Sequence, residues 1–445
     1  MIEIRENLTA GALEKKVRAL FDTSARKIKS LASTWRPEQG APVFTIDGKY
    51  TSRGWTEWTQ GFQFGAEILQ FDATGDQEFL TSGRSHTIDY MASHISHIGV
   101  HDHGFNNVST YGNLLRLMNE GRITENEGER NFYELALKIS GAVQAARWTN
   151  IADGGGYIYS FNGPHSLFVD TIRSLRALAL SHQLGHVLMR ENDQRISLLE
   201  RLLKHAEATA RYSVYYGKGR DFYDVRGRTA HESIFNVNDG NYRCPNSQQG
   251  YSPFSTWTRG LAWAMCGFAE QLEFLAGFGN KDAEPLLREA AEATCDFYIA
   301  NSPTDGIPYW DTGAPHLHRL GDWSGKPADP FNAFEPVDSS AASIAAQGLL
   351  RLGKYSKNRK YTQAALTICD SLFAEPYLST DPDHQGLILH AVYHRPNGWD
   401  RAPGSDGVPR GESCMWGDYH ARELALYLLR EIEQKPYLTF WSNRK

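Results

Sequence analysis

The chain has 445 residues, enough for two or three domains of ordinary size or for one large barrel or toroid. Its net charge of −6 comes from charges of both signs spread along the chain, and the lack of a basic stripe argues against nucleic acid as the main ligand. The five cysteines are far apart and have no CxxC spacing, which argues against a disulfide framework or a zinc ribbon.

The N-terminal residues 1–7 lack the apolar core of a signal peptide. No apolar run in the sequence approaches the length of a membrane span. An odd number of scattered cysteines fits a reducing compartment. These features predict a cytoplasmic protein without a membrane partner.

Helical periodicity dominates the rest of the chain. An apolar stripe at helical spacing opens the series with Leu13, Val17, Leu20, Phe21, Ile28 and Leu31. A capping box at 124–127 precedes a predicted helix at 132–143, and Asp338 is a predicted cap of a helix at 341–352. About twelve helices are predicted, beginning near residues 9, 58, 77, 109, 127, 167, 193, 257, 282, 339, 360 and 415.

Strand-like alternation is scarce and short, at 157–161 and 387–393. Antiparallel helices without a consistent sheet can close as six hairpins, so we expect an all-α (α/α)6 barrel in a single domain spanning 1–445. The segments 261–275 and 341–350 have the apolar character of inner helices, whereas 9–32 and 193–214 are amphipathic and predicted to be outer. An α-solenoid is the alternative, but no fixed-period repeat stands out.

Three stretches break the helical period, at 215–256, 301–337 and 376–414. They are rich in Gly, Pro, Asp, Trp and Tyr, and loops this long in a compact domain are usually functional. Aromatic residues make up 12% of the chain, and many of them lie in such stretches rather than at periodic positions. This placement favours a flat-faced ligand such as a carbohydrate.

Two aspartates stand alone among apolar, aromatic or imidazole neighbours: Asp102 within 101–105 and Asp170 within 166–172. A carboxylate in such surroundings loses solvation and tends to stay protonated, as a general acid requires. A helix cap or turn is the alternative for Asp102. For Asp170 the alternative is an aspartate in the first turn of a helix, which would lower its pKa instead.

Other side chains have two possible roles each. His182 and His186 have helical i,i+4 spacing but lack the glutamate of a zincin motif, so we expect hydrogen-bonding histidines and no metal or other cofactor. Trp58 is either a stacking platform or a core residue. Arg259 suits a carboxylate ligand, or forms a structural salt bridge, for example with Glu270.

Taken in order along the chain, these segments resemble the unsaturated glucuronyl hydrolases, glycoside hydrolase family 88. The resemblance rests on the ordered segments 58–62, 101–105, 166–172, 249–251, 255–263, 338–342 and 417–419. It departs from the family pattern after Asp102, where His103, Asn106 and Asn107 are polar, and in the segment 376–414.

The resemblance implies an (α/α)6 barrel that acts on oligosaccharides ending in a 4,5-unsaturated uronic acid. It implies Asp170 as general acid/base and Asp102 as its carboxylate partner. The residues that it implies for the sugar pocket are Trp58, His101, His231, Gln249, Trp257, Arg259 and Trp263.

The chemistry expected from that substrate is hydration of the C4=C5 vinyl ether, with one side chain acting first as acid and then as base. Repulsion from Asp102 is expected to hold Asp170 protonated. The alternatives are an unsaturated rhamnogalacturonyl hydrolase, an inverting glycosidase on the same barrel, and a glycan-binding protein without catalysis.

Overall fold

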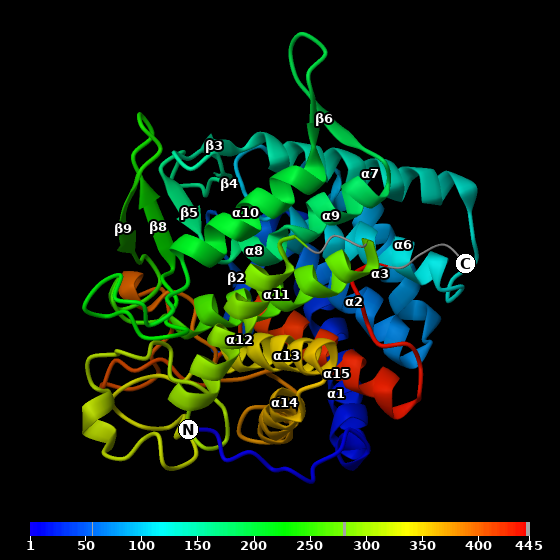
Figure 1. The fold of residues 1–445 in the computed structure, drawn as a ribbon. Coiled ribbons are helices and arrows are strands. Elements are labelled where there is room, and N and C mark those ends of the chain that lie inside the picture. Colours follow the sequence, from blue (N-terminus) through cyan, green and yellow to red (C-terminus); the bar gives the residue numbers. More distant parts are fainter. Residues whose placement is uncertain (56, 279–281, 442–445) are drawn as a thin grey trace.

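The computed structural model of the chain describes residues 1–55, 57–278 and 282–441 and is about 51% helical. In this part of the chain an inner ring of helices is surrounded by an outer ring, as Figure 1 shows. The inner segments are α2 (Gln60–Thr74), α5 (His103–Asn107) continued by η4 (Val108–Gly112) and α6 (Asn113–Asn119), α8 (Thr171–Ser174) with α9 (Arg176–Gln183), α11 (Thr258–Phe278), α13 (Ser339–Ser356) and α15 (Met415–Ile432). The outer helices are α1 (Glu14–Thr34), α3 (Gln77–Tyr90), α7 (Glu127–Ala146), α10 (Leu198–Tyr212), α12 (Glu284–Asn301) and α14 (Arg359–Leu372).

The inner ring closes on itself. Helix α2 packs on η4, α5 on α8, α8 on α11, α11 on α13, α13 on α15, and α15 returns to α2. Helix α11 is buried on all sides from its first residue to Leu275, whereas α1 and α10 bury one stripe each. The predicted (α/α)6 barrel and its division into inner and outer helices are therefore confirmed.

Small antiparallel sheets of two or three strands lie between the helices of the barrel in the sequence. They pair β1 (Pro42–Ile46) with β2 (Lys49–Ser52), β3 (Trp148–Asn150) with β4 (Gly156–Ile158), β6 (Val187–Met189) with β7 (Arg195–Ser197), and β8 (Glu232–Phe235) with both β5 (Ser166–Phe168) and β9 (Tyr242–Asn246). The remaining short helical elements are α4 (Ala92–Ile95), η1 (Gly11–Leu13), η2 (Pro37–Gln39), η3 (Glu57–Thr59), η5 (Leu317–Leu320) and η6 (Arg395–Asn397).

The predicted helix boundaries differ from the structure at a few positions. The helix expected from residue 193 begins at Leu198, because the β6–β7 hairpin occupies the residues before it. Helix α7 is capped by Asn126, whose side chain accepts a hydrogen bond from the Glu129 N–H, not by Thr124. Asp338 caps α13 as predicted. The segment 387–393 forms no named strand among the described residues and contributes only an isolated bridge at Ile388.

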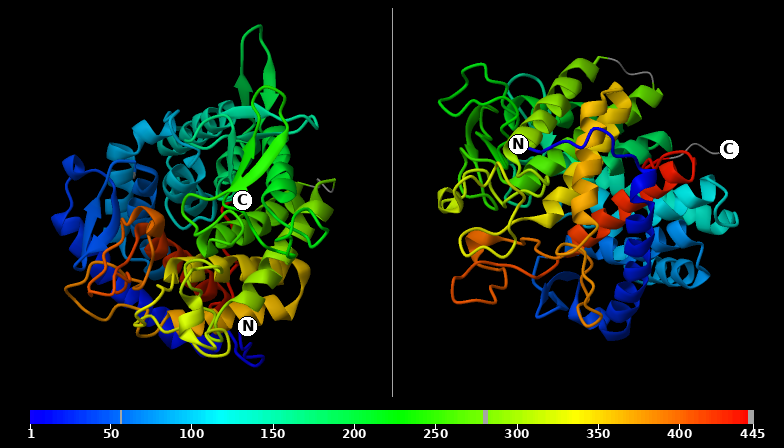
Figure 2. Two further views of the ribbon diagram at one scale, coloured as in Figure 1. Left: turned by 90° about the vertical axis from the view of Figure 1, so that its left-hand side faces the viewer. Right: turned by 90° about the horizontal axis from the view of Figure 1, so that it is seen from below.

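The three aperiodic stretches lie together at one end of the barrel, which we call the mouth. They are drawn green (215–256), yellow (301–337) and orange (376–414) in Figure 1, and the left view of Figure 2 looks onto them. The inner helices α5, α8, α11, α13 and α15 all begin at this end, since each follows one of the loops or strands there. Residues just before these helices therefore converge at the mouth.

Glycines at the interfaces of the inner ring bring the helix backbones close together. At Gly104 a Cβ atom would lie 2.1 Å from the carbonyl oxygen of Ser174, so α5 and α8 touch backbone to backbone. Equivalent close approaches to a neighbouring inner segment occur at Gly61, Gly65, Gly267, Gly348 and Gly417. Because interiors are packed at crystal-like density, a side chain at such positions forces the helices apart.

A network of buried charges fills the centre of the ring. Arg173 of α8 pairs with Glu423 of α15 at 2.6 Å and with Glu270 of α11 at 3.1 Å. Arg351 of α13 pairs with Glu273 of α11 at 2.8 Å. Breaking such a buried pair leaves an uncompensated charge, so the network fixes how four inner helices are arranged.

We searched the described helices for candidate membrane spans. None of those within 1–55, 57–278 and 282–441 combines the length and the apolar character needed to cross a bilayer.

We predict that Gly104→Ala lowers the melting temperature by roughly 1–3 °C, because overpacking of a dense core costs about 1–3 kcal/mol. Gly277→Ala is the matched control, since a Cβ atom there meets nothing within 4 Å. Differential scanning calorimetry of both variants checks this expectation. Equal melting temperatures for the two variants would show that α5 and α8 do not pack as described.

Candidate active site

Asp102 and Asp170 meet at the mouth, where each directly precedes an inner helix. Asp102 precedes α5 and Asp170 precedes α8, and these two helices touch at Gly104. The imidazole of His101 lies between the two carboxylates. Its Nε2 atom is 3.7 Å from Oδ1 of Asp102 and 3.5 Å from Oδ1 of Asp170. All three side chains are buried, so their charges interact with little screening.

Helix capping does not explain either aspartate. Within the described chain, neither the Asp102 nor the Asp170 side chain makes a capping hydrogen bond to the helix that follows it. The backbone at His101 is instead held by other side chains. Gln144 Nε2 donates to the His101 carbonyl at 2.7 Å, and the Ser174 hydroxyl donates to it at 2.8 Å. The imidazole is therefore presented to the two carboxylates from a fixed backbone.

The protonation of the three groups is coupled. Burial raises the pKa of Asp102 to about 6, with the charge on His101 opposing the shift and that on Asp170 adding to it. Burial also works to raise the pKa of Asp170, but pairing with His101 outweighs it and holds that pKa below its ordinary value. Burial alone would lower the pKa of His101, yet the two carboxylates raise it overall.

The directions of these pKa shifts differ from the expectation from the sequence, which was a raised pKa at Asp170. The physical reason is that hydrogen bonding and charge pairing with His101 outweigh burial at Asp170, whereas burial outweighs the charge of His101 at Asp102. An adjacent cation stabilises the ionised carboxylate. These pKa shifts favour a protonated His101 beside an ionised Asp170, and Asp102, with a pKa of about 6, is the carboxyl that is more readily protonated.

Strand pairing places His231 beside this group. Strand β5 leads into Asp170 and pairs with β8, and the Val169 N–H donates to the His231 carbonyl at 2.9 Å. His231 Nδ1 accepts from the N–H groups of Gln248 and Gln249, at 3.1 and 3.3 Å. Its Nε2 atom consequently carries the proton, and that buried donor has no partner among the described residues. Burial lowers the pKa of His231 to about 4, so this imidazole is neutral.

Arg259 is buried and its donors are occupied by the protein. It donates to Asp338 Oδ2 at 3.2 Å, to Gln249 Oε1 at 2.8 Å, to the Tyr393 carbonyl at 2.7 Å and to the Val392 carbonyl. Its salt-bridge partner is Asp338, not Glu270, which pairs with Arg173 in the network below. Arg259 thus ties the loop carrying Gln249 to two other segments of the mouth.

The three tryptophans implied for the sugar pocket lie around these groups and differ in how exposed they are to solvent. Trp257 is buried, and its ring centre is 4.6 Å from that of His231. Trp263 is buried between Phe105 and His420. Trp58 is partly exposed and stacks on Trp416, with ring centres 5.0 Å apart.

Sequence reasoning missed several residues of this site. Phe161 is 50% exposed and stacks on His101, with ring centres 5.9 Å apart and planes 28° apart. The 78% exposed ring of Trp55 lies 6.3 Å from that of Phe161. An aromatic residue in the Gly/Pro turn 160–164 was the available signal for Phe161. Gln144 lies inside a regular outer helix, where no local pattern marks it.

His103 and His182 contact other parts of the protein. His103 Nδ1 is 3.0 Å from the Ser140 hydroxyl and its Nε2 is 2.9 Å from the His97 carbonyl. His182 packs on Phe278 near the end of α11 that lies away from the mouth. Over the described ranges, no three His, Cys, Asp or Glu side chains form a group that could hold a metal ion.

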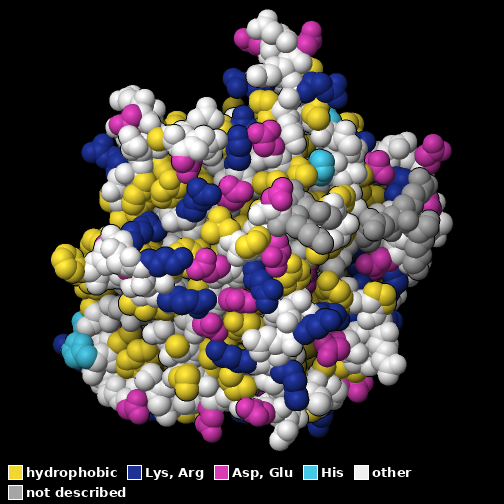
Figure 3. Space-filling view, viewed as in Figure 1, with side chains coloured by type: hydrophobic (Ala, Val, Ile, Leu, Met, Phe, Trp, Pro, Cys, Tyr) yellow, Lys and Arg dark blue, Asp and Glu magenta, His cyan; other side chains and the backbone are white. Residues whose placement is uncertain are grey.

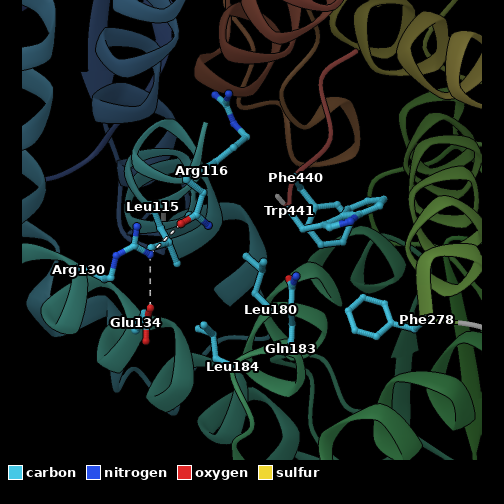
Figure 4. A pocket seen from close by; sticks show the side chains of 12 residues that line it. Leu115, Arg116, Arg130, Glu134, Leu180, Gln183, Leu184, Phe278, Phe440 and Trp441 are labelled. Atoms are coloured by element: carbon cyan, nitrogen blue, oxygen red, sulfur yellow. Dashed lines mark hydrogen bonds and ion pairs between the residues drawn. The ribbon is translucent and has the colours of Figure 1, made fainter. Parts of the chain in front are cut away.

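A cavity of about 390 Å³ lies at the far end of the barrel, around the last turns of α6, α9 and α11. Figure 4 shows Leu180, Gln183 and Phe278 pointing into it, opposite Phe440 and Trp441. Its position at the C-terminal ends of the inner helices separates it from the paired aspartates at their N-terminal ends.

We predict that Asp102→Asn lowers the pKa of His101, because the variant removes one of the two carboxylates that raise it. The imidazole carbon resonances of His101, followed by NMR over pH 5–9, report this pKa. Asp76→Asn is the matched control, since Asp76 caps α3 and asparagine is an equally good cap. An unchanged His101 pKa in Asp102→Asn would contradict the described pairing.

No protein-family model matches the chain. Its relatives include an unsaturated glucuronyl hydrolase of Formosa agariphila, 24% identical over 385 residues that cover 86% of this chain and 80% of the relative. An unsaturated glucuronyl hydrolase of Bacillus sp. strain GL1 is 27% identical over 404 residues, covering 86% and 89%.

Solved structures agree with these relatives. The crystal structure of an unsaturated glucuronyl hydrolase specific for heparin has a TM-score of 0.73 at 20% identity, over 95% of this chain and 98% of that one. A structure of a variant with dGlcA-Glc-Rha-Glc has a TM-score of 0.71 at 22% identity, over 94% and 97%. The resemblance predicted from the sequence is thereby confirmed, and the chain is a glycoside hydrolase related to the unsaturated glucuronyl hydrolases.

Proposed function

We propose that the protein removes a 4,5-unsaturated uronic acid from the non-reducing end of oligosaccharides by hydrating the C4=C5 bond. The named activity of its relatives supports this reaction. The single observation that carries the proposal is the buried group Asp102–His101–Asp170, in which one imidazole nitrogen serves two carboxylates. Such a group can deliver a proton and then accept one, as hydration requires.

The reaction begins with protonation of C4 by Asp170. Positive charge then develops at C5, where the ring oxygen stabilises it. Water adds at C5, and the Asp170 carboxylate takes the proton that the water loses. The product is a hemiketal at C5; its ring opens to a ketone, and the hemiacetal left at C1 expels the alcohol of the reducing-side sugar. Asp170 is then protonated, and passing this proton back to His101 restores the resting site.

His101 supplies the proton that Asp170 needs at the start. In the resting site Asp170 is ionised and His101 is the protonated neighbour, 3.5 Å away. The uronate carboxylate of an entering substrate adds negative charge to a dry site, which raises the pKa of Asp170. The proton then moves from Nε2 of His101 to Asp170, while Asp102 compensates any charge that remains on the imidazole.

The surrounding residues have distinct proposed roles. The unpartnered Nε2–H of His231 donates to a substrate oxygen, since a buried donor gains most from a partner that only the ligand provides. Trp58 covers one face of the sugar ring, and the amide of Gln249 contacts its hydroxyls. Arg259 positions Gln249 by holding its Oε1 atom, and Trp257 and Trp263 are the packed walls behind these groups.

We predict that Asp170→Asn lowers kcat on an unsaturated disaccharide at least a thousandfold, since it removes the acid and the base together. The loss of ultraviolet absorbance of the conjugated alkene measures the rate. Asp400→Asn is a matched control: Asp400 is a half-buried acid near the mouth that accepts hydrogen bonds from two backbone N–H groups. Undiminished turnover by Asp170→Asn would refute the assignment.

A parallel assay separates the proposed reaction from ordinary glycoside hydrolysis. The wild-type enzyme is given matched disaccharides with a saturated and an unsaturated terminal uronic acid. Hydration predicts release of the reducing-side sugar from the unsaturated compound alone. Cleavage of the saturated compound at a comparable rate would favour the inverting glycosidase, and tight binding without cleavage of either would favour a glycan-binding protein.

A further inference from the structure

A second aromatic surface lies at the mouth, outside the site described above. It consists of Phe222, Tyr223, Tyr251 and Phe254, and we call it the rim platform. The Phe222 side chain is fully exposed, and those of Tyr223 and Phe254 are 52% and 43% exposed. The Tyr223 and Phe254 rings stack with centres 4.7 Å apart and planes 26° apart. Clustered aromatic side chains that stay exposed to solvent often mark a binding site.

The loop that carries Phe222 and Tyr223 is held rigid by its own polar groups. The carboxylate of Asp224 accepts hydrogen bonds from four backbone N–H groups, those of Tyr216, Gly217, Lys218 and Arg220. Asp221 accepts from the Tyr223 N–H at 2.7 Å and pairs with Arg228 at 3.0 Å. The aromatic side chains are therefore attached to a fixed backbone. Ordering this loop when a ligand binds costs little conformational entropy.

The rim platform is continuous with the segment that forms the site. Arg228 donates to the Pro253 carbonyl at 3.3 Å, and the Thr229 N–H donates to the Thr256 hydroxyl at 3.2 Å. Phe254 precedes Trp257 by three residues, which limits the distance between their Cα atoms to about 11 Å. Trp257 in turn contacts His231 beside Asp170. The distance from platform to pocket is thus that of one or two sugar rings.

Polar side chains surround the platform. The loop 215–230 carries four basic side chains and two acidic ones. Three of the basic ones are ion-paired, Lys218 with Glu289, Arg226 with Asp296 and Arg228 with Asp221. Figure 3 shows charged side chains of both signs interspersed with hydrophobic ones on the left of that view, where Figure 1 draws the mouth loops. Charged groups beside aromatic faces can hydrogen-bond the hydroxyls of a sugar whose apolar face stacks on the rings.

We propose that the rim platform is an outer subsite that binds a sugar ring of an acidic oligosaccharide beyond the linkage that is cleaved. The inference rests on the proposed function and extends it to substrate length. The apolar C–H face of a pyranose packs on Tyr223 and Phe254, while polar side chains of loop 215–230 hydrogen-bond its hydroxyls. The platform makes the enzyme prefer tetrasaccharides and longer chains to disaccharides, which reach only the inner pocket.

The test compares Tyr223→Ala and Phe222→Ala with wild type on unsaturated di-, tetra- and hexasaccharides from one lyase digest. Loss of a stacking contact worth about 1.4 kcal/mol predicts a tenfold rise in KM for the tetra- and hexasaccharides. The disaccharide kcat/KM stays within about twofold of wild type, since the inner pocket is intact. Met189→Ala is the control, because Met189 is about as exposed as Tyr223 but lies on the β6–β7 hairpin away from the mouth loops.

Three other outcomes separate the possible failures. An unchanged dependence on chain length in both variants overturns the outer subsite and leaves the proposed function intact. A wild-type dimer that both variants convert to monomers, with chain-length dependence unaltered, shows that the platform contacts a second copy of the chain instead. Wild-type enzyme that cleaves none of the unsaturated oligosaccharides overturns the proposed function, and with it the subsite.

Discussion

The imidazole of His101, shared by two buried carboxylates, is the interaction on which the site depends. Two ionised aspartates cannot both be buried side by side without a cation, and His101 provides that cation at 3.7 and 3.5 Å. The two carboxyls are shifted in opposite directions, because pairing with His101 holds the pKa of Asp170 below its ordinary value while burial raises the pKa of Asp102 to about 6. The three buried groups can therefore exchange a proton among themselves with little access of water.

The barrel fixes the positions of these three residues relative to one another. Inner helices that begin at a common end place the residues before α5 and α8 next to each other, and the contact at Gly104 sets their separation. Below them, Arg173, one turn after Asp170, is anchored by Glu270 and Glu423 from two other inner helices. The buried charges and the close backbone contacts thus act together to fix Asp170 relative to His101.

Much of this could be predicted from the sequence, and the exceptions have physical causes. Apolar periodicity identified the helices and their inner or outer positions, and isolated acids among apolar residues marked Asp102 and Asp170. The direction of the pKa shift at Asp170 could not be predicted, because it depends on an imidazole, that of His101, which only the fold places beside this carboxyl. The partner of Arg259 could not be predicted either, since Asp338 is distant in sequence. Phe161 and Gln144 become recognisable only once the fold brings them to His101.

The most direct test of the central claim is a reaction in D2O with an unsaturated disaccharide, read by NMR and mass spectrometry of the released product within a single turnover. Delivery of a solvent-exchangeable proton from the His101–Asp170 pair predicts one deuterium at C4 of a ring-opened 5-keto uronic acid. Release of a sugar acid that retains its C4=C5 bond and carries no deuterium would contradict it, because the alkene would then have taken no part in the chemistry.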